Sequence, residues 1–457
     1  MDFSANNTEL WAPIIQMGIM AALILLANIM QRKIPFINKS LMPIAVLSGF
    51  ILLILRTTGI IYIDGEFLEK LTYHALALGF IAMALRVPEK KSDGGALIGA
   101  KSGALIVSTY LVQAIVGLVI SLGFVISFML ELFPASGILL PMAYGQGPGQ
   151  ANNVGTTYEA LGMAGGRTFG LSLSAMGYLC ACVVGVIFLN IYNSRGMVRR
   201  AGEKADVSGS VTLDTFQHNG EIPIAESVDK LSVQFAFVAI IYLVTYLITW
   251  GITSLLQAVA PGLAGTVSTL LWGFNFIIGS VVATGCRVLL SGLKSAKIMS
   301  RQYQNNYLLS RISGLAFDLM IIAGIAGIEI SDLEGMWIPF ISMAVIGGIV
   351  TFIYLKIMCK KLYPNYTHEG FFSMYGMLTG TISSGVLLLR ELDPEFKTPA
   401  ANNLITGSSF GIVFGAPVLL LVSLGAKGFY ASLAVIAIAA VYLAGLLVFM
   451  LKAGRKK

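Results

Sequence analysis

The chain has 457 residues, of which 56% are hydrophobic and 12% are charged, and its formal net charge is +7. A soluble protein has about 25% charged residues, so this chain has too few charges to solvate a globular surface. The composition excludes a cytosolic enzyme, a disordered protein and a secreted disulfide scaffold, and it predicts an all-α polytopic membrane protein. The positive charge does not indicate nucleic-acid binding, because most basic residues stand in short loops between apolar runs, where they orient a membrane protein.

Eleven apolar runs are long enough to cross a bilayer, since about 20 residues rising about 1.5 Å each cover about 30 Å of hydrocarbon. They lie at 10–31, 41–61, 70–86, 103–130, 167–193, 231–255, 262–290, 311–330, 335–358, 401–424 and 428–451. We expect the first run to be a span and not a cleavable signal peptide, because no basic residue precedes it.

Two further apolar segments, 136–165 and 370–395, are interrupted. Each has a short apolar arm, then a tip rich in glycine and neutral polar residues, then a second short arm. An arm of about 10 residues reaches only about halfway through the hydrocarbon. The pattern therefore predicts two re-entrant hairpins, whose backbone is stable at membrane depth only where it faces protein or a water-filled cavity.

The loop charges predict the orientation of the chain. Cytoplasmic loops carry an excess of Lys and Arg, and this rule places the N-terminus outside and the C-terminus inside. If 136–165 crossed the membrane fully, Arg195, Arg199 and Arg200 would lie outside, whereas a re-entrant hairpin returns them to the inside. We expect a multi-pass protein of the cytoplasmic (inner) membrane of a cell.

The two interrupted segments resemble each other in the spacing of a Tyr-Gly pair and a later glycine. The matched positions are Tyr144, Gly145 and Gly149 in the first segment and Tyr375, Gly376 and Gly380 in the second. Each segment follows four spans and precedes one, and the two halves start on opposite sides of the membrane. The sequence thus predicts two inverted repeats, and paired interrupted segments in inverted halves indicate the binding site of a secondary transporter.

The predicted domains follow from this repeat. They are a first repeat at 1–193, a cytoplasmic linker at 194–230, a second repeat at 231–424, and an extra C-terminal span with a basic tail at 425–457.

Broken helices expose backbone groups that have no helical partner. Freed N–H groups at a helix N-terminus suit a carboxylate, and freed carbonyls with neutral side-chain oxygens suit a dehydrated Na⁺. The candidate binding residues are Gly145, Gln146, Gly147, Gly149, Gln150, Asn152, Asn153, Thr156, Thr379, Gly380, Thr381, Ser383, Ser384, Asn402 and Asn403. The sequence does not assign individual Na⁺ ligands, and the alternative for each residue is a structural role that joins helices or caps their ends.

Asp318 lies well inside an apolar run, and an ionisable residue at that depth is a functional candidate because it is costly to bury. It could bind a cation or carry a proton, or it could be a structural partner of a nearby polar residue. His74 stands in the third span of the first half, as Asp318 does in the second. The histidines and cysteines show no metal-ligand spacing, and there is no nucleophile motif, so we expect neither an enzyme nor a cofactor besides a coupling ion.

Four segments carry a family resemblance: PMAYGQGPGQANNVGTTYEALG, GRTFGLSLSAMGYLCACVVGVIFLN, YGMLTGTISSGVLLLRELDPEF and NNLITGSSFGIVFGAPVLLL. They resemble the sodium/glutamate symporter family, which belongs to the ion transporters built from five-span inverted repeats with re-entrant loops. The resemblance implies Na⁺-coupled uptake of an anionic amino acid by a homodimer, in which a moving domain of each subunit carries the hairpins. It maps the family's glycine-rich tips onto Gly145, Gly147, Gly149, Gly376 and Gly380.

The first tip reads Gly-Gln-Gly-Pro-Gly, where the family typically has Gly-Gly-His-Gly. Because this difference lies where the substrate should bind, the expected substrate is glutamate or a related small carboxylate. We therefore expect a secondary active transporter that carries such a solute together with Na⁺ by alternating access. The alternative is a proton- or cation-coupled antiporter that uses Asp318.

Overall fold

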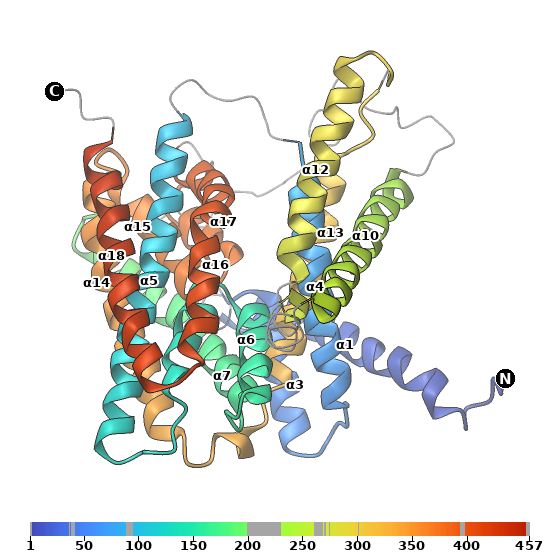
Figure 1. Cartoon of the computed structure of the whole chain (residues 1–457), viewed down its shortest axis with the longest axis horizontal. Helices are drawn as coiled ribbons and strands as arrows, with labels where there is room; N and C mark the ends of the chain where they lie inside the picture. Colours follow the sequence, from blue (N-terminus) through green and yellow to red (C-terminus); the bar gives the residue numbers. More distant parts are fainter. Residues whose placement is uncertain are drawn as a thin grey trace. The chain divides into compact units, whose positions relative to one another are not determined.

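The structure is a computed structural model of the chain. It describes residues 2–35, 37, 42–87, 95–198, 230–259, 268, 271–273, 275–299, 301–393 and 398–453. All regular elements among these residues are helices (Figure 1). The predicted all-α class is therefore confirmed.

The chain forms two compact units, and each combines segments that are distant in sequence. Unit 1 comprises Met1–Glu69, Ser92–Ala205 and Ile322–Lys457, whereas unit 2 comprises Lys70–Lys91 and Asp206–Ile321. Both interrupted segments belong to unit 1. Helices α4 (Gly65–Leu85) and α13 (Asn306–Ala326) run from one unit into the other.

The remaining elements belong to one unit each. In unit 1 they are α1 (Thr8–Lys33), α3 (Ile44–Thr57), α5 (Gly95–Ser127), η1 (Pro134–Ile138), η2 (Pro141–Gly145), α6 (Pro148–Ala160), α7 (Gly166–Leu179), η3 (Cys180–Val184), α8 (Gly185–Ser194), η4 (Ile330–Leu333), α14 (Trp337–Leu362), α15 (Thr367–Thr379), α16 (Ile382–Arg390), α17 (Ala400–Gly425) and α18 (Phe429–Lys452). In unit 2 they are α10 (Lys230–Val259) and α12 (Asn275–Ser295).

Ten helices in the described part of the chain are long and apolar enough to cross a membrane. They correspond to ten of the eleven predicted runs, and α7, η3 and α8 together form one of them. The remaining run, 41–61, is represented by the 14-residue apolar helix α3, and residue 41 lies outside the described residues. The chain is therefore a multi-pass membrane protein.

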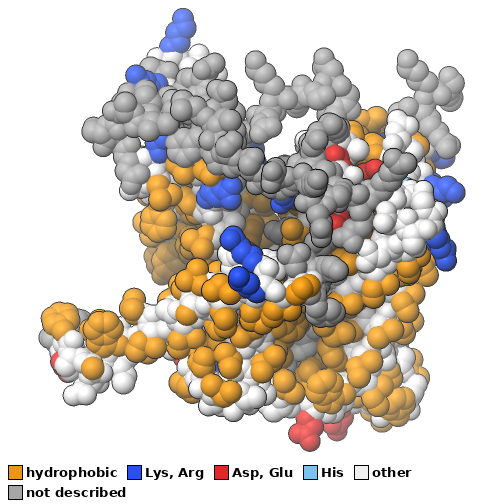
Figure 2. Space-filling view, turned by 180° about the vertical axis from the view of Figure 1, so that it is seen from behind, with side chains coloured by type: hydrophobic (Ala, Val, Ile, Leu, Met, Phe, Trp, Pro, Cys, Tyr) orange, Lys and Arg blue, Asp and Glu red, His pale blue; other side chains and the backbone are white. Residues whose placement is uncertain are grey.

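Hydrophobic side chains cover much of the visible surface of the helices (Figure 2). On α10, for example, Phe235, Leu243 and Leu247 are exposed, while Val238 and Ile241 are buried in the core of unit 2. Large apolar side chains on the outside of a helix are stable where the surrounding solvent is lipid.

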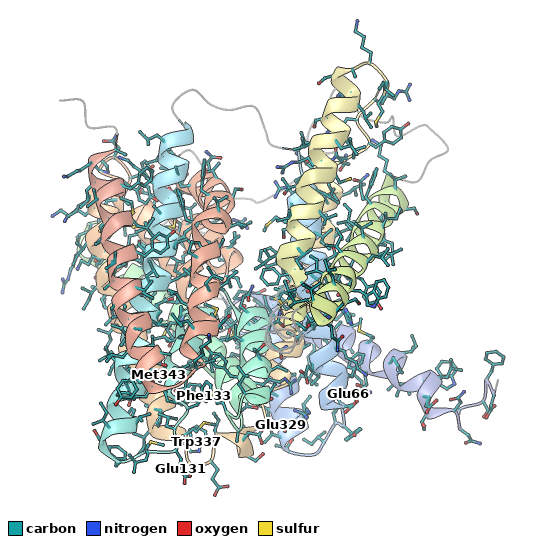
Figure 3. All side chains as sticks on the ribbon, viewed as in Figure 1. Glu66, Glu131, Phe133, Glu329, Trp337 and Met343 are labelled. Carbon is teal, nitrogen blue, oxygen red and sulfur yellow. The ribbon has the colours of Figure 1, made fainter. Side chains whose placement is uncertain are left out.

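Acidic residues gather at one end of unit 1. Figure 3 shows Glu131 and Glu329 at this end, together with Trp337 at the start of α14. Lys360 and Lys361 lie in the last turn of α14, a helix of 26 residues. Helix α14 therefore starts beside acidic residues and ends in lysines, and the orientation of these ends across the membrane stays a prediction.

Helix α5 is the centre of unit 1, and α17 and α18 lie beside it (Figure 1). The first interrupted segment packs on the same helix at a point where two backbones touch. A Cβ atom on Gly117 of α5 would collide with the carbonyl oxygen of Gly137 in η1. Such close packing is typical of helices in lipid, where apolar burial gives little drive for helices to associate.

We expect Gly117→Ala to lower the stability of the protein by about 1–3 kcal/mol, because the added methyl group overpacks this contact. The matched control is Gly123→Ala on the same helix, where an added Cβ meets nothing within 4 Å. Alanine is favoured over glycine in a helix, so this control should keep or raise the melting temperature in detergent. Equal melting temperatures for the two variants would contradict the packing account.

Candidate functional site

The first interrupted segment folds as a hairpin whose tip is Gln146 and Gly147. Gly147 has φ +87° and ψ −177°, a conformation that is essentially restricted to glycine. Pro148 follows at the first position of α6, where its missing N–H is no loss. The end of α6 then lies close to the residues that precede η1, because the ring centroids of Phe133 and Tyr158 are 5.1 Å apart.

The second interrupted segment is a hairpin of two helices, α15 and α16, joined by Gly380 and Thr381. Its arms touch through their backbones. A Cβ on Gly376 would lie 2.8 Å from the carbonyl oxygen of Ser384, and a Cβ on Gly385 would collide with the carbonyl oxygen of Ser373. Glycines at these two positions therefore allow the sharp return of the chain.

The two tips meet inside unit 1. A Cβ on Gly147 would lie 3.7 Å from Thr381 Cγ2 and 3.8 Å from the carbonyl oxygen of Gly380. Helix α7 adjoins them, since a Cβ on its Gly177 would collide with the carbonyl oxygen of Thr379. The two interrupted segments, whose tips are more than 200 residues apart in the sequence, are thus neighbours in the structure.

This meeting brings together the N-termini of two helices. Gly147 is the N-cap of α6 and Thr381 is the N-cap of α16, and no side chain caps either helix. The first N–H groups of a helix have no partner within the helix, and the aligned peptide dipoles give this end a partial positive charge. The place where the tips meet is therefore suited to an anion.

Neutral oxygen atoms surround the tips. Gln150 and Ser384 are each 2% exposed, and a Cβ on Gly380 would lie 2.9 Å from Ser384 Oγ. Within the described part of the chain, Gln150 Oε1, Thr381 Oγ1 and Ser384 Oγ are buried and accept or donate no hydrogen bond. A buried polar atom without a partner costs about 1–3 kcal/mol, so a ligand that bonded these atoms would remove that cost. Asn153 is also buried, at 4% exposed.

Other candidates are near the tips but already bonded or differently placed. Gln146 is half-buried and its amide nitrogen lies 3.6 Å from Met142 Sδ. Thr379 donates its hydroxyl to the carbonyl oxygen of Tyr375 at 2.8 Å. Gly145 and Gly149 are buried backbone positions on either side of the first tip, and the Ser383 side chain lies outside the described residues.

Asn152 and Thr156 are hydrogen-bonded to a network of charged residues. Asn152 Oδ1 accepts a hydrogen bond of 3.0 Å from Arg167 Nε, and Thr156 Oγ1 donates to Glu69 Oε1 at 3.2 Å. Arg167 lies 3.9 Å from Glu69, and its backbone N–H donates to Glu159 Oε1 at 2.9 Å. These bonds join α6 to α7 and to the start of α4.

Asn402 and Asn403 lie in the first turn of α17. Asn402 is exposed, and Asn403 Nδ2 donates to Tyr366 Oη at 2.8 Å. Tyr366 is the N-cap of the 13-residue helix α15, which places it about 20 Å along the helix from the second tip.

Asp318 and His74 belong to unit 2. Asp318 is exposed on α13, and no described residue forms a hydrogen bond or ion pair with its carboxylate. His74 Nδ1 lies 2.7 Å from Tyr242 Oη. Asn275 Nδ2 donates to Tyr73 Oη at 2.6 Å in the same cluster, so His74 is part of a hydrogen-bonded group.

Two residues near the tips were not predicted. Tyr178 of α7 lies between the hairpins, with its Cδ1 3.2 Å from a Cβ on Gly380. Gln113 of α5 contacts both hairpins, and it was detectable as a polar residue in the apolar run 103–130. The described residues contain no group of three or more His, Cys, Asp and Glu side chains that could hold a metal ion.

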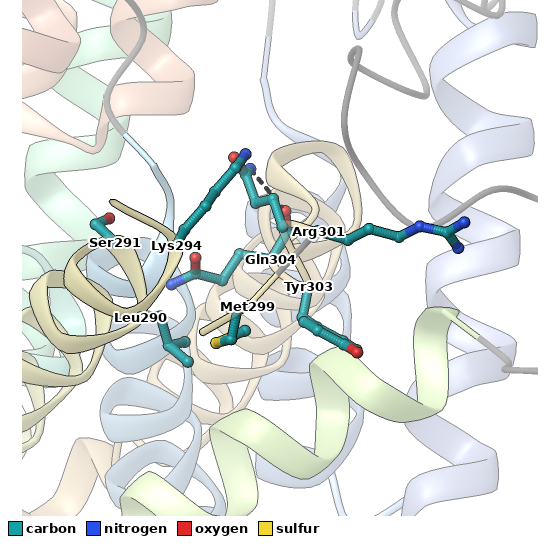
Figure 4. A pocket seen from close by; sticks show the side chains of 8 residues that line it. Leu290, Ser291, Lys294, Met299, Arg301, Tyr303 and Gln304 are labelled. Carbon is teal, nitrogen blue, oxygen red and sulfur yellow. Dashed lines mark hydrogen bonds between the residues drawn. The ribbon is translucent and has the colours of Figure 1, made fainter. Parts of the chain in front are cut away.

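A small cavity lies elsewhere, beside the C-terminal end of α12 in unit 2 (Figure 4). Its lining includes Lys294, Arg301 and Gln304, and its volume is about 20 Å³. This space suffices for one water molecule and not for an organic solute.

No known family model and no curated protein matches the chain. The functional argument therefore rests on the geometry of the tips.

Glu159 provides a pH-dependent test of the charged network. It lies in the last turn of α6, outside the ten spans, where burial raises its pKa although Arg167 opposes the rise. A carboxyl whose pKa is higher in the folded than in the unfolded protein destabilises the fold when ionised, and this cost disappears as the pH falls. We expect wild type to gain melting temperature relative to Glu159→Gln as the pH falls from neutral toward the ordinary pKa of a glutamate, about 4.3. A difference independent of pH would contradict this account.

Proposed function

We propose that the protein is a secondary active transporter that carries glutamate or a related small carboxylate together with Na⁺ by alternating access. The observation that supports this proposal is the meeting of two helix N-termini at Gly147 and Thr381, next to buried oxygens that have no partner. Helices that are interrupted at the same place in a membrane protein are typical of transporter binding sites.

The N-termini select the charge of the solute. Free N–H groups of α6 and α16 can donate to a carboxylate, and both dipoles favour a negative charge at this place. Interactions of this kind are strongest where water is excluded. A solute without an anionic group would leave the N–H groups without partners, which is unfavourable for its binding.

The neutral oxygens select the ion. Thr381 Oγ1, Ser384 Oγ and Gln150 Oε1 can replace part of the hydration shell of a monovalent cation. No carboxylate of the protein is among these atoms, so the cation has no fixed counter-charge there. The carboxylate of the solute supplies that charge, and the cation in turn neutralises the solute. Each then raises the affinity of the other by the same factor, which is the requirement for symport.

The test is uptake of labelled glutamate into proteoliposomes with an inward Na⁺ gradient, and with K⁺ in its place. We expect uptake only with Na⁺. If glutamate is not taken up, a competition screen of small carboxylates in the same vesicles identifies the solute. Absence of Na⁺-dependent uptake across the whole screen would contradict the proposal.

Ser384→Ala removes one unpartnered hydroxyl and leaves no bulky group. We expect at least about a tenfold loss of uptake at low Na⁺, because an oxygen in contact with a charged ligand contributes about 1.5–3 kcal/mol. The matched control is Ser373→Ala in the same hairpin, since Ser373 is fully buried and its hydroxyl already donates to the carbonyl oxygen of Gly370 at 3.0 Å. Equal uptake by the two variants would argue against a ligand role for Ser384.

A second candidate function is cation-coupled or proton-coupled exchange through Asp318. It is supported by the exposed carboxylate in the middle of an apolar helix without a bonded partner among the described residues. A fixed carboxylate can hold a cation or a proton in the absence of a solute. Asp318→Asn should abolish such exchange, and unchanged transport by this variant would exclude it.

A further inference from the structure

Gln113 lies in the middle of α5 and contacts both hairpins, although α5 belongs to neither. It is 1% exposed. Its Nε2 donates to the carbonyl oxygen of Leu378 in α15 at 2.9 Å and to Thr351 Oγ1 of α14 at 3.0 Å. Its Oε1 lies 3.0 Å from a Cβ placed on Gly145, next to the first tip.

These bonds fix the orientation of the amide group. Both hydrogens of Nε2 are used, one for each acceptor. Reversing the amide would place Oε1 against the carbonyl oxygen of Leu378, and two acceptors repel each other. The carbonyl group of Gln113 is therefore directed toward the backbone of the first hairpin.

The oxygen itself lacks a hydrogen-bond partner. Gln113 Oε1 is buried and has no hydrogen-bond partner among the described residues. Gly145 brings the hairpin backbone close to it, since any side chain there would collide with the ring of Tyr110. In membrane transporters, backbone carbonyl oxygens of unwound helix segments coordinate Na⁺, and the amide carbonyl of Gln113 offers the same kind of neutral oxygen beside the first tip.

We propose that Gln113 Oε1 is a ligand of the coupling Na⁺, in an inference that rests on the proposed function. The same side chain then holds the second hairpin through Leu378 and the first hairpin through the ion. Because Leu378 precedes Thr379 and Gly145 precedes Gln146, the ion is linked to both tips. Na⁺ binding therefore orders the place where the carboxylate binds.

The proposal distinguishes a loss of ion affinity from a loss of solute affinity. Gln113 contacts the solute only through the ion and the hairpins. A variant without Oε1 should need more Na⁺, and at saturating Na⁺ it should bind the solute with nearly wild-type affinity.

The experiment measures thermal stability of the purified full-length protein in nanodiscs while NaCl replaces choline chloride at constant ionic strength. A ligand that binds the folded state raises the melting temperature according to its concentration relative to its Kd. Gln113→Met keeps a similar volume and removes the oxygen. We expect its apparent Kd for Na⁺ to rise by at least about tenfold, because the variant loses one contact between an oxygen and a charged ligand.

The matched control is Gln234→Met in α10. Gln234 is also 1% exposed, but its Oε1 accepts from the N–H of Asn305 at 3.1 Å and its Nε2 donates to the carbonyl oxygen of Tyr303 at 2.8 Å. Its loss should lower the melting temperature without changing the Kd for Na⁺. This comparison separates ion binding from the general cost of removing a buried amide.

The outcomes are distinct. If wild type shows no stabilisation by Na⁺, the proposed function fails in its choice of ion. If wild type is stabilised and Gln113→Met has the wild-type Kd, the inference about Gln113 is overturned. Should Gln113→Met not fold, Gln113→Asn retracts the oxygen by one methylene group and should also raise the Kd. An unchanged Kd in Gln113→Asn then overturns the inference.

Discussion

The structure depends on one constraint, which is that backbone groups without helical partners must be satisfied in an apolar surrounding. Unit 1 contains two such interruptions, and it brings them together at Gly147 and Thr381. This arrangement also explains the glycines around the tips. The helices of the hairpins must pack closely to enclose the unpartnered backbone groups, and at such distances there is no room for a side chain. The hairpins leave the N–H groups at the starts of α6 and α16, and the oxygens of Thr381 and Ser384, without a partner among the described residues.

The sequence predicts the positions of the interruptions better than their partners. Gly147 and Pro148 mark the first tip in the sequence, because glycine and proline are the residues that a sharp turn into a helix requires. The apolar runs likewise predict the spans, since length and composition decide whether a helix can cross the hydrocarbon. Gln113 could not be assigned to the tips, because its acceptor in Leu378 is 265 residues away. Asn403 is a candidate because it opens the span 401–424, and its partner Tyr366 could not be predicted from the sequence, because the two become neighbours only when α15 and α17 pack.

The neutral polar residues of helix α6 differ in whether they have hydrogen-bond partners. Asn152 and Thr156 are four residues apart, so they lie on the same face of the helix, and that face meets Arg167 and Glu69. Gln150 lies near the N-terminal end, where the helix meets the tips, and its Oε1 has no partner in the described part of the chain. Composition alone cannot separate these residues, because all are neutral and polar. Their separation follows from the helical period combined with the position of the charged network.

In the proposed mechanism, the neutrality of the tips decides the type of transport. A carboxylate of the protein would hold a cation whether or not a solute were present, and such a site favours exchange. A site of neutral oxygens and helix N-termini does not fully neutralise the charge of a cation alone or of an anion alone. Binding either ion by itself is therefore unfavourable, because burying an unpaired charge is costly. Together the two ligands form a pair with no net charge, and the helix dipoles and oxygens need only orient it. Gln113 extends this coupling to the protein, because a side chain that is anchored on one hairpin and reaches the other through the ion makes the shape of the carboxylate site depend on the bound cation.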